Sequence, residues 1–126
     1  MYTKQDIMND MEHLGILPSD TVLVHSSLKS IGATENGADT VLDAFCGYLN
    51  SGLLVMPGHT WDYINAQNPE FDVMESPVCV GVMPELFRKR KGVYRSLHPT
   101  HSLLAYGHDA EQFVSGDEKF DTPCAP

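Results

Sequence analysis

Two histidines stand three residues apart in the stretch Arg95–Ser102, and a proline directly follows the first of them. Proline fixes its own φ and biases the preceding residue toward an extended conformation, so His98 is expected on a stiff, non-helical backbone. An imidazole with an ordinary pKa of about 6.5 can take and give a proton near neutral pH. The pattern predicts a proton-transfer site at His98 supported by His101; an ordinary pair of loop histidines is the plain alternative.

Two further polar loops are expected beside this site. Residues 21–25 are a short apolar run that predicts a strand covered on both faces, and residues 53–56 predict the next strand. A helix over 37–50 joins the two strands into a parallel βαβ unit. Polar residues follow the two strands, at 25–32 and 57–63. The carboxyl ends of neighbouring parallel strands meet at one edge, which is the usual place for binding sites in α/β sheets.

The remaining periodic segments complete the prediction of a single α/β domain over residues 1–126. Its sheet is expected to be mixed or mostly parallel and flanked by helices. The expected elements are a helix from a Thr3 cap to Leu14, a long irregular segment over 64–77 that forms a wall or flap of the site, a helix over 82–91, a strand over 102–107 and a short helix over 109–114.

Charge and composition exclude several classes of function. The formal net charge of −9 does not supply the broad basic face that nucleic acid binding needs, and it favours a cationic small molecule. The basic residues gather at 88–91, which is typical of a solvated helix end but could also face phosphate groups.

Cysteine usage and apolar runs predict a cytoplasmic protein. Cys46, Cys79 and Cys124 show no C-x-x-C spacing and cannot all pair within the chain, so a structural disulfide or zinc framework is not expected. The sequence shows no signal-peptide pattern, and its apolar runs are too short to cross a bilayer, so no membrane partner is expected.

Other chemistries stay open on the residues alone. Ser26 or Ser27 could pair with His98 as a nucleophile, but no G-x-S-x-G elbow surrounds either serine. His59, His98 and His101 could bind zinc, although a proline interrupts the helix that would align the last two. Cys79 or Cys124 could carry an acyl group, and the backbone N–H groups of the Ser/Gly-rich loop 25–32 could bind a pyrophosphate.

Four stretches occur in the order seen in the aminoglycoside 3-N-acetyltransferases, and the chain strongly resembles that family. These stretches are Val24–Gly32, Met56–Trp61, Ser76–Arg88 and Arg95–Ser102. The resemblance continues over Thr122–Cys124, after which this chain has Ala125 where the family's pattern has a glycine. Family members are about twice as long, so the resemblance implies that a carboxyl-terminal half is absent from this sequence.

The resemblance implies the α/β fold of this family, truncated here, which is unrelated to the common acetyltransferase fold. It implies transfer of an acetyl group from acetyl-coenzyme A to the 3-amino group of a 2-deoxystreptamine aminoglycoside, which inactivates the antibiotic. Fold and cofactor do not fix the acceptor, so another amine is the alternative, as is a non-catalytic fragment that binds coenzyme A. A monomer or homodimer without a metal is expected.

The resemblance also assigns roles to residues. His98 matches the family's general base, and His101 matches a more variable position; the carboxylate that would orient His98 cannot be named. One loop matches the part that holds coenzyme A, and another would line the acceptor pocket. The coenzyme A loop is His25, Ser26, Ser27, Leu28, Lys29, Ser30, Ile31 and Gly32, and the acceptor loop is His59, Thr60, Trp61 and Asp62.

Overall fold

A computed structural model describes residues 1–120 of the chain, which form a four-stranded mixed sheet. The strands are β1 (Thr21–Leu23), β2 (Leu53–Pro57), β3 (Tyr94–Arg95) and β4 (Leu103–Gly107), in the spatial order β1-β2-β4-β3. β1 and β2 are parallel, as predicted, but β4 is antiparallel to both of its neighbours. A mostly parallel sheet is therefore wrong and the mixed alternative is confirmed, because the short loop 96–102 returns the chain beside β3 without a crossover.

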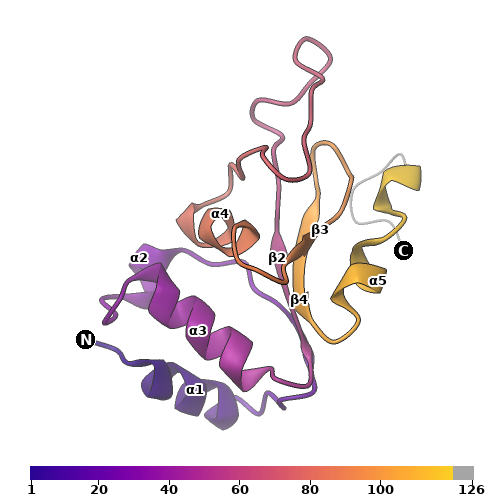
Figure 1. Ribbon diagram of the computed structural model, residues 1–126. Helices are drawn as coiled ribbons and strands as arrows, with labels where there is room; N and C mark the ends of the chain where they lie inside the picture. The colour runs from indigo at the N-terminus through magenta and orange to yellow at the C-terminus, as the bar shows by residue number, and fades with distance from the viewer. Residues whose placement is uncertain (121–126) are drawn as a thin grey trace.

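Three helices cover one face of the sheet (Figure 1). α1 (Lys4–His13) begins with the predicted capping box, in which Thr3 and Asp6 each bind the other's backbone N–H. α3 (Ala38–Tyr48) packs between α1 and α4 (Val82–Arg88). Between these helices and the sheet lies the main core: Met11, Ala38, Val41, Leu42, Leu49, Leu54, Met56, Val78, Met83, Phe87 and Leu104.

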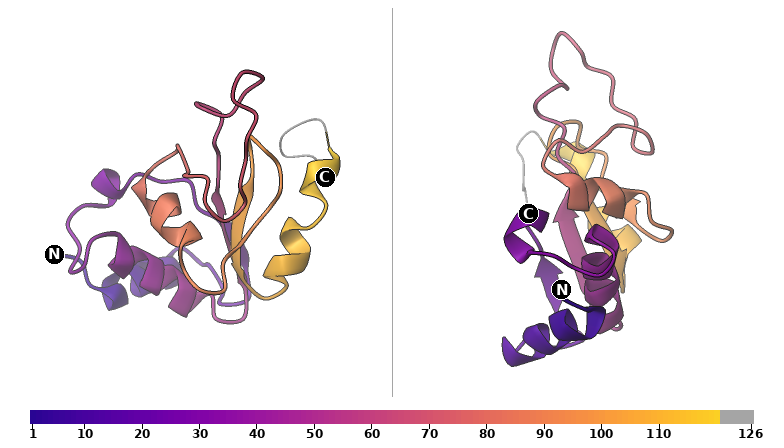
Figure 2. Two further views of the ribbon diagram at one scale, coloured as in Figure 1. Left: turned by 45° about the horizontal axis from the view of Figure 1, so that its top comes forward. Right: turned by 90° about the vertical axis from the view of Figure 1, so that its left-hand side faces the viewer.

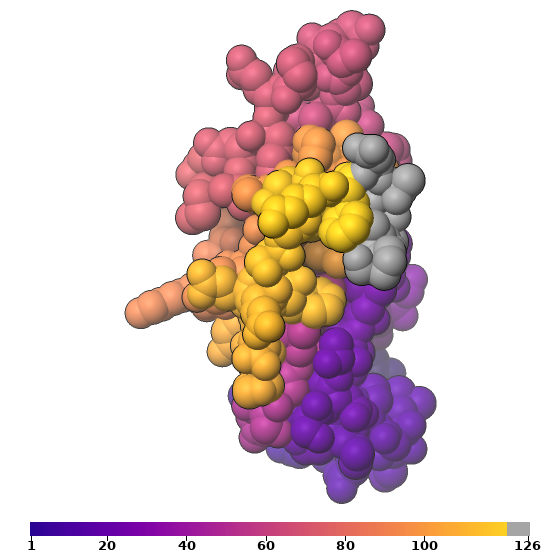
Figure 3. Space-filling view, turned by 90° about the vertical axis from the view of Figure 1, so that its right-hand side faces the viewer, coloured from indigo at the N-terminus to yellow at the C-terminus, as the bar shows by residue number. Residues whose placement is uncertain are grey.

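One helix, α5 (Ala110–Val114), covers the other face beside β3 and β4 (Figures 1 and 3). It encloses a smaller cluster formed by Leu53, Val55, Ala105, Ala110 and Val114. A 3-10 turn, η1 (Asp117–Lys119), follows it. The helices predicted over 82–91 and 109–114 are both present, as α4 and α5, although α4 ends at Arg88 rather than at the predicted residue 91.

The prediction that β1 is covered on both faces is wrong for the described residues. β1 lies at the edge of the sheet, and Leu23 is 63% exposed on the face that α5 covers farther along. An apolar run predicts a strand but not its place in the sheet, because edge and central strands can share one composition. Val22, which points to the opposite face, does pack against the main core.

The segment expected as a loop after β1 contains a short helix, α2 (Leu28–Ile31). Its two apolar residues, Leu28 and Ile31, are three positions apart and pack against the main core. This burial explains why a helical turn forms in a stretch of otherwise exposed polar residues.

The long segment 64–77 has no helix or strand, as predicted, and projects beyond the carboxyl end of β2 (Figures 1 and 2, pink). Thr122–Cys124 and Ala125, on which part of the family resemblance rests, lie outside the described residues. Within residues 1–120, no helix has the length and apolar character that crossing a membrane requires.

Candidate active site

The sheet topology brings the predicted loops to one edge. β1 and β2 run parallel and β4 begins opposite the end of β2, so the segments after β1, after β2 and before β4 share that edge. Two backbone hydrogen bonds extend the β2–β4 ladder into the loops: Gly58 N–H donates to the Ser102 carbonyl over 2.7 Å, and Thr60 N–H donates to the Thr100 carbonyl over 2.9 Å. The sequence-based expectation of a shared rim is confirmed.

Histidines gather at this rim from separate segments. The His101 ring lies between two others, with its centroid 4.9 Å from that of His59 and 5.8 Å from that of His98. His25 is close enough to influence the titration of His59. We call His25, His59, His98 and His101 the imidazole cluster. No carboxylate among residues 1–120 hydrogen-bonds to any of these rings, so the acid expected to orient His98 is not among their described partners.

The His98 ring is buried, with 6% exposure, and its Nδ1 atom is fully engaged. Nδ1 accepts a hydrogen bond from the backbone N–H of His101 over 2.9 Å and another from that of Thr100 over 3.3 Å. A ring nitrogen that accepts cannot carry a proton, so these bonds assign the neutral tautomer with the proton on Nε2. The proline after His98 starts the tight turn that aims both N–H groups back at the ring.

The environment of His59 holds its imidazole in the unprotonated form. Partial burial, and after it the charges that His101, His25 and His98 would carry, lower the pKa of His59 below its ordinary 6.5. Burial disfavours the charged ring, and each protonated neighbour would repel it. The cluster therefore supplies a neutral imidazole near pH 7.

Acidification is expected to destabilise the folded chain through His59. The unfolded chain takes up this proton near pH 6.5 and the folded chain only at lower pH, so the unfolded state binds more protons in that window and stability falls as pH falls. Urea unfolding at pH 7.5 and 5.5 measures the loss. His59→Gln should make it smaller, and an identical pH dependence in wild type and variant would contradict the role given to His59.

The acceptor loop divides into buried and exposed residues. Thr60 is buried; its hydroxyl donates to the Pro99 carbonyl over 2.5 Å, so it joins the two histidine-bearing loops rather than facing a ligand. Trp61 and Asp62 are exposed, and His59 is half-buried. A substrate-binding role for these last three stays a prediction.

Arg95 joins three segments of the rim and was given no role by sequence reasoning. Its guanidinium donates to the Gly58 carbonyl over 2.8 Å, to Ser102 Oγ over 3.0 Å and to the Ser76 carbonyl. It also lies over the Phe71 ring, 4.9 Å from the centroid. The only sequence signal was a lone arginine beside a histidine motif, which does not show what it contacts.

Most of the predicted coenzyme A loop is open to solvent. His25, Ser26, Ser27, Lys29, Ser30 and Gly32 are exposed, and none of their side chains hydrogen-bonds to another described residue. Leu28 and Ile31 anchor the loop to the core. A coenzyme A-binding role for the loop stays a prediction.

The alternative chemistries gain no support from residues 1–120. No three His, Cys, Asp or Glu side chains in this part of the chain are arranged to hold a metal ion. Of the three rings of the zinc hypothesis, His101 meets His59 at a tilt of 59° and His98 edge-on at 84°. Cys79 is a half-buried free thiol whose N–H donates to the His59 carbonyl over 2.8 Å. Cys124 lies outside the described residues.

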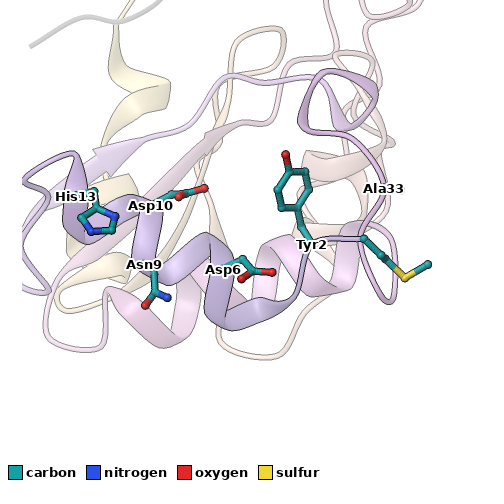
Figure 4. Close-up of a pocket in the computed structure, with 7 residues that line it drawn as sticks. Tyr2, Asp6, Asn9, Asp10, His13 and Ala33 are labelled. Atoms are coloured by element: carbon teal, nitrogen blue, oxygen red, sulfur yellow. The ribbon is translucent and has the colours of Figure 1, made fainter.

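A hollow on α1 lies beside Gly32, the last residue of the predicted coenzyme A loop (Figure 4). Tyr2, Asp6, Asn9, Asp10 and His13 line it together with Met1 and Ala33, and none of them belongs to a predicted loop. Asp6 is engaged in the helix cap, which lowers its pKa through hydrogen bonds with the Thr3 backbone and hydroxyl. The hollow is thus built around the start of α1.

Known proteins resemble this chain in sequence and structure. The sequence profile of the aminoglycoside 3-N-acetyltransferase family matches residues 23–126. The SPbeta prophage-derived aminoglycoside N(3')-acetyltransferase-like protein YokD of Bacillus subtilis (strain 168) is 35% identical over 134 residues, covering 90% of this chain and 49% of YokD.

Solved structures share the fold. AAC-IIIb in its binary complex with CoASH superimposes with a TM-score of 0.81 at 26% identity, covering 91% of this chain and 49% of that one. A histidine-to-alanine mutant of aminoglycoside acetyltransferase AAC(3)-IVa in complex with apramycin gives 0.82 at 32% identity, covering 90% and 46%. This chain spans about half the length of the curated relatives it matches. The profile match over most of the chain shows that it belongs to the aminoglycoside 3-N-acetyltransferase family.

Proposed function

We propose that the protein carrying this chain transfers an acetyl group from acetyl-coenzyme A to the 3-amino group of a 2-deoxystreptamine aminoglycoside, and so confers resistance. The observation that carries the proposal is the family match over residues 23–126, which includes all the loops of the rim. The relatives crystallised with CoASH and with apramycin support both substrates. A cytoplasmic location is part of the proposal, in keeping with the free thiols of Cys46 and Cys79.

The reaction needs an acceptor for the proton of the amine. The amine nitrogen, once deprotonated, attacks the thioester carbonyl carbon, the C–S bond breaks, and coenzyme A leaves as a thiolate that is protonated to the thiol. The imidazole of His59, whose pKa is lowered by burial and by its histidine neighbours, suits the removal of that proton. Two roles fit His98 at this centre: accepting the proton, as predicted from the sequence, or donating a hydrogen bond to the carbonyl oxygen.

Acetylation of an antibiotic tests the proposal. The protein should release free thiol from acetyl-coenzyme A in the presence of gentamicin or kanamycin, and mass spectrometry should find a singly acetylated drug. Coenzyme A binding without modification of any aminoglycoside would reject the resistance function and leave the two alternatives, another amine acceptor or a non-catalytic fragment.

Reversing a charge in the coenzyme A loop should weaken cofactor binding. Lys29 is exposed near the small polar residues of the loop, so Lys29→Glu should lower the affinity for coenzyme A by about tenfold through repulsion of its phosphates. Calorimetric titration measures the change. Lys91→Glu, in the basic run at 88–91, is the matched control; a larger loss there would move the phosphate site to that run.

A further inference from the structure

We propose that His98 acts as a hydrogen-bond donor through its Nε2–H, rather than as the general base, and that it stabilises the oxygen of the thioester carbonyl during transfer. This rests on the proposed function. Its starting point is the pair of backbone N–H groups, of Thr100 and His101, that both point at Nδ1. They leave the neutral ring one arrangement, with its only proton on Nε2.

A base must offer an unoccupied lone pair, and His98 offers none in this arrangement. Taking a proton at Nδ1 would break both backbone hydrogen bonds and leave two buried donors without an acceptor, which is costly. Taking a proton at Nε2 would first require the tautomer with its proton on Nδ1. In that tautomer the Nδ1–H group would face the same two backbone N–H donors. The turn at Pro99 thus holds the ring as a donor.

The donor atom has no acceptor among the described residues. Nδ1 of His98 carries both hydrogen bonds of the ring within residues 1–120, and no side chain or carbonyl among these residues accepts from Nε2. His98 as a whole is buried, with 6% exposure. A ring fixed by its turn, whose donor is not used by residues 1–120, is preorganised for an oxygen acceptor.

The movement of electrons during acetyl transfer indicates that this oxygen acceptor is the thioester carbonyl oxygen. As the amine nitrogen bonds to the carbonyl carbon, the carbonyl π electrons move onto oxygen, and they return when the C–S bond breaks. A fixed N–H donor stabilises that oxygen most when its charge is greatest, and the donor keeps its proton throughout. The proton of the amine goes to another group.

Four enzyme forms separate the two roles in the protein that carries this chain. His98→Asn keeps an oxygen that can accept from the backbone N–H groups and keeps an N–H donor, but it cannot act as a base. His98→Asp keeps the acceptor alone, and His98→Ala keeps neither. If His98 is a donor, His98→Asn should retain kcat within about tenfold of wild type. In His98→Asp and His98→Ala, kcat should fall by a factor of about 10² to 10³.

The pH profile and coenzyme A binding give independent readouts. If His98 is a donor, the acid limb of the plot of kcat/KM against pH should stay in place in His98→Asn. If His98 is the base, the substitution should remove that limb. Coenzyme A affinity, measured by calorimetry, should stay near that of wild type in the Asn variant, showing that the site folds. Equal loss in Asn and Ala with intact coenzyme A binding would overturn the proposal.

Nuclear magnetic resonance of the histidine side chains tests the tautomer without any activity. In ¹⁵N-labelled protein above pH 7.5, the His98 ring should show an unprotonated Nδ1 and a protonated Nε2. A protonated Nδ1, or rapid exchange between tautomers, would overturn the donor role. Because this measurement needs no acceptor amine, a failure of acetylation and a failure of the His98 assignment are distinguishable.

Discussion

Replacing Arg95 by methionine is expected to lower the free energy of unfolding by about 2–4 kcal/mol and to disorganise the rim. Arg95 binds Gly58, Ser76 and Ser102, which belong to three separate segments. Methionine fills much of the same volume but has no donor, so the Ser76 carbonyl loses its partner and the Gly58 carbonyl keeps only the Ser102 hydroxyl. Urea denaturation monitored by circular dichroism measures the loss.

The expected cost of replacing Arg95 comes from its lost hydrogen bonds rather than from a lost ion pair. No described carboxylate forms an ion pair with it; carbonyls, a hydroxyl and the Phe71 ring surround the guanidinium instead. Burial, followed by the charge of Arg88, lowers the pKa of Arg95, although a guanidinium keeps its proton. Only a planar fork reaches all three acceptors, so Arg95→Lys should fall between wild type and methionine.

Arg90→Met is the matched control for this prediction. Arg90 makes ion pairs with Asp39 and Asp43, whose side chains are 65% and 53% exposed. Pairs of this kind contribute about 0–1 kcal/mol. If Arg95→Met cost no more than Arg90→Met, the rim would not depend on the buried guanidinium.

Local patterns predicted the elements that position the site. The capping box at Thr3 and Asp6 is a complete signal within four residues, and α1 begins where it indicates. The run 53–56 between two turn signals marks β2, and its spacing from β1 indicates the parallel pair. Because parallel neighbours share an edge, the meeting of the polar loops also followed from sequence.

Contacts between distant segments were not predictable. The bonds from Arg95 reach residues 19 and 37 positions away, and nothing in the local pattern specifies those partners. The state of His98 was missed for a different reason. Pro99 indicates a stiff turn, but only the resulting backbone directions show that two N–H groups converge on Nδ1, which is the observation behind the proposed donor role.

Replacing Gly107 by alanine is expected to cost at least about 3 kcal/mol, because the new Cβ would collide with the backbone just before β2. Gly107 pairs with Leu53 at the end of the sheet opposite the rim, and the N–H of His108 donates to the Gly52 carbonyl over 2.9 Å. An added Cβ would lie 2.3 Å from that carbonyl oxygen. Backbone cannot swing aside as a side chain can, so the two strands would have to separate.

Gly116→Ala separates this steric effect from backbone strain. Both glycines have a positive φ, +121° at Gly107 and +86° at Gly116, but a Cβ at Gly116 would meet nothing within 4 Å. Strain alone costs about 1–2 kcal/mol. Urea unfolding should therefore show that Gly107→Ala is much less stable than Gly116→Ala. Equal losses of stability in the two variants would mean that β2 and β4 can separate freely. The other ends of these strands carry His59 and the turn of His98. A rim on such strands could not hold the geometry that a fixed donor requires.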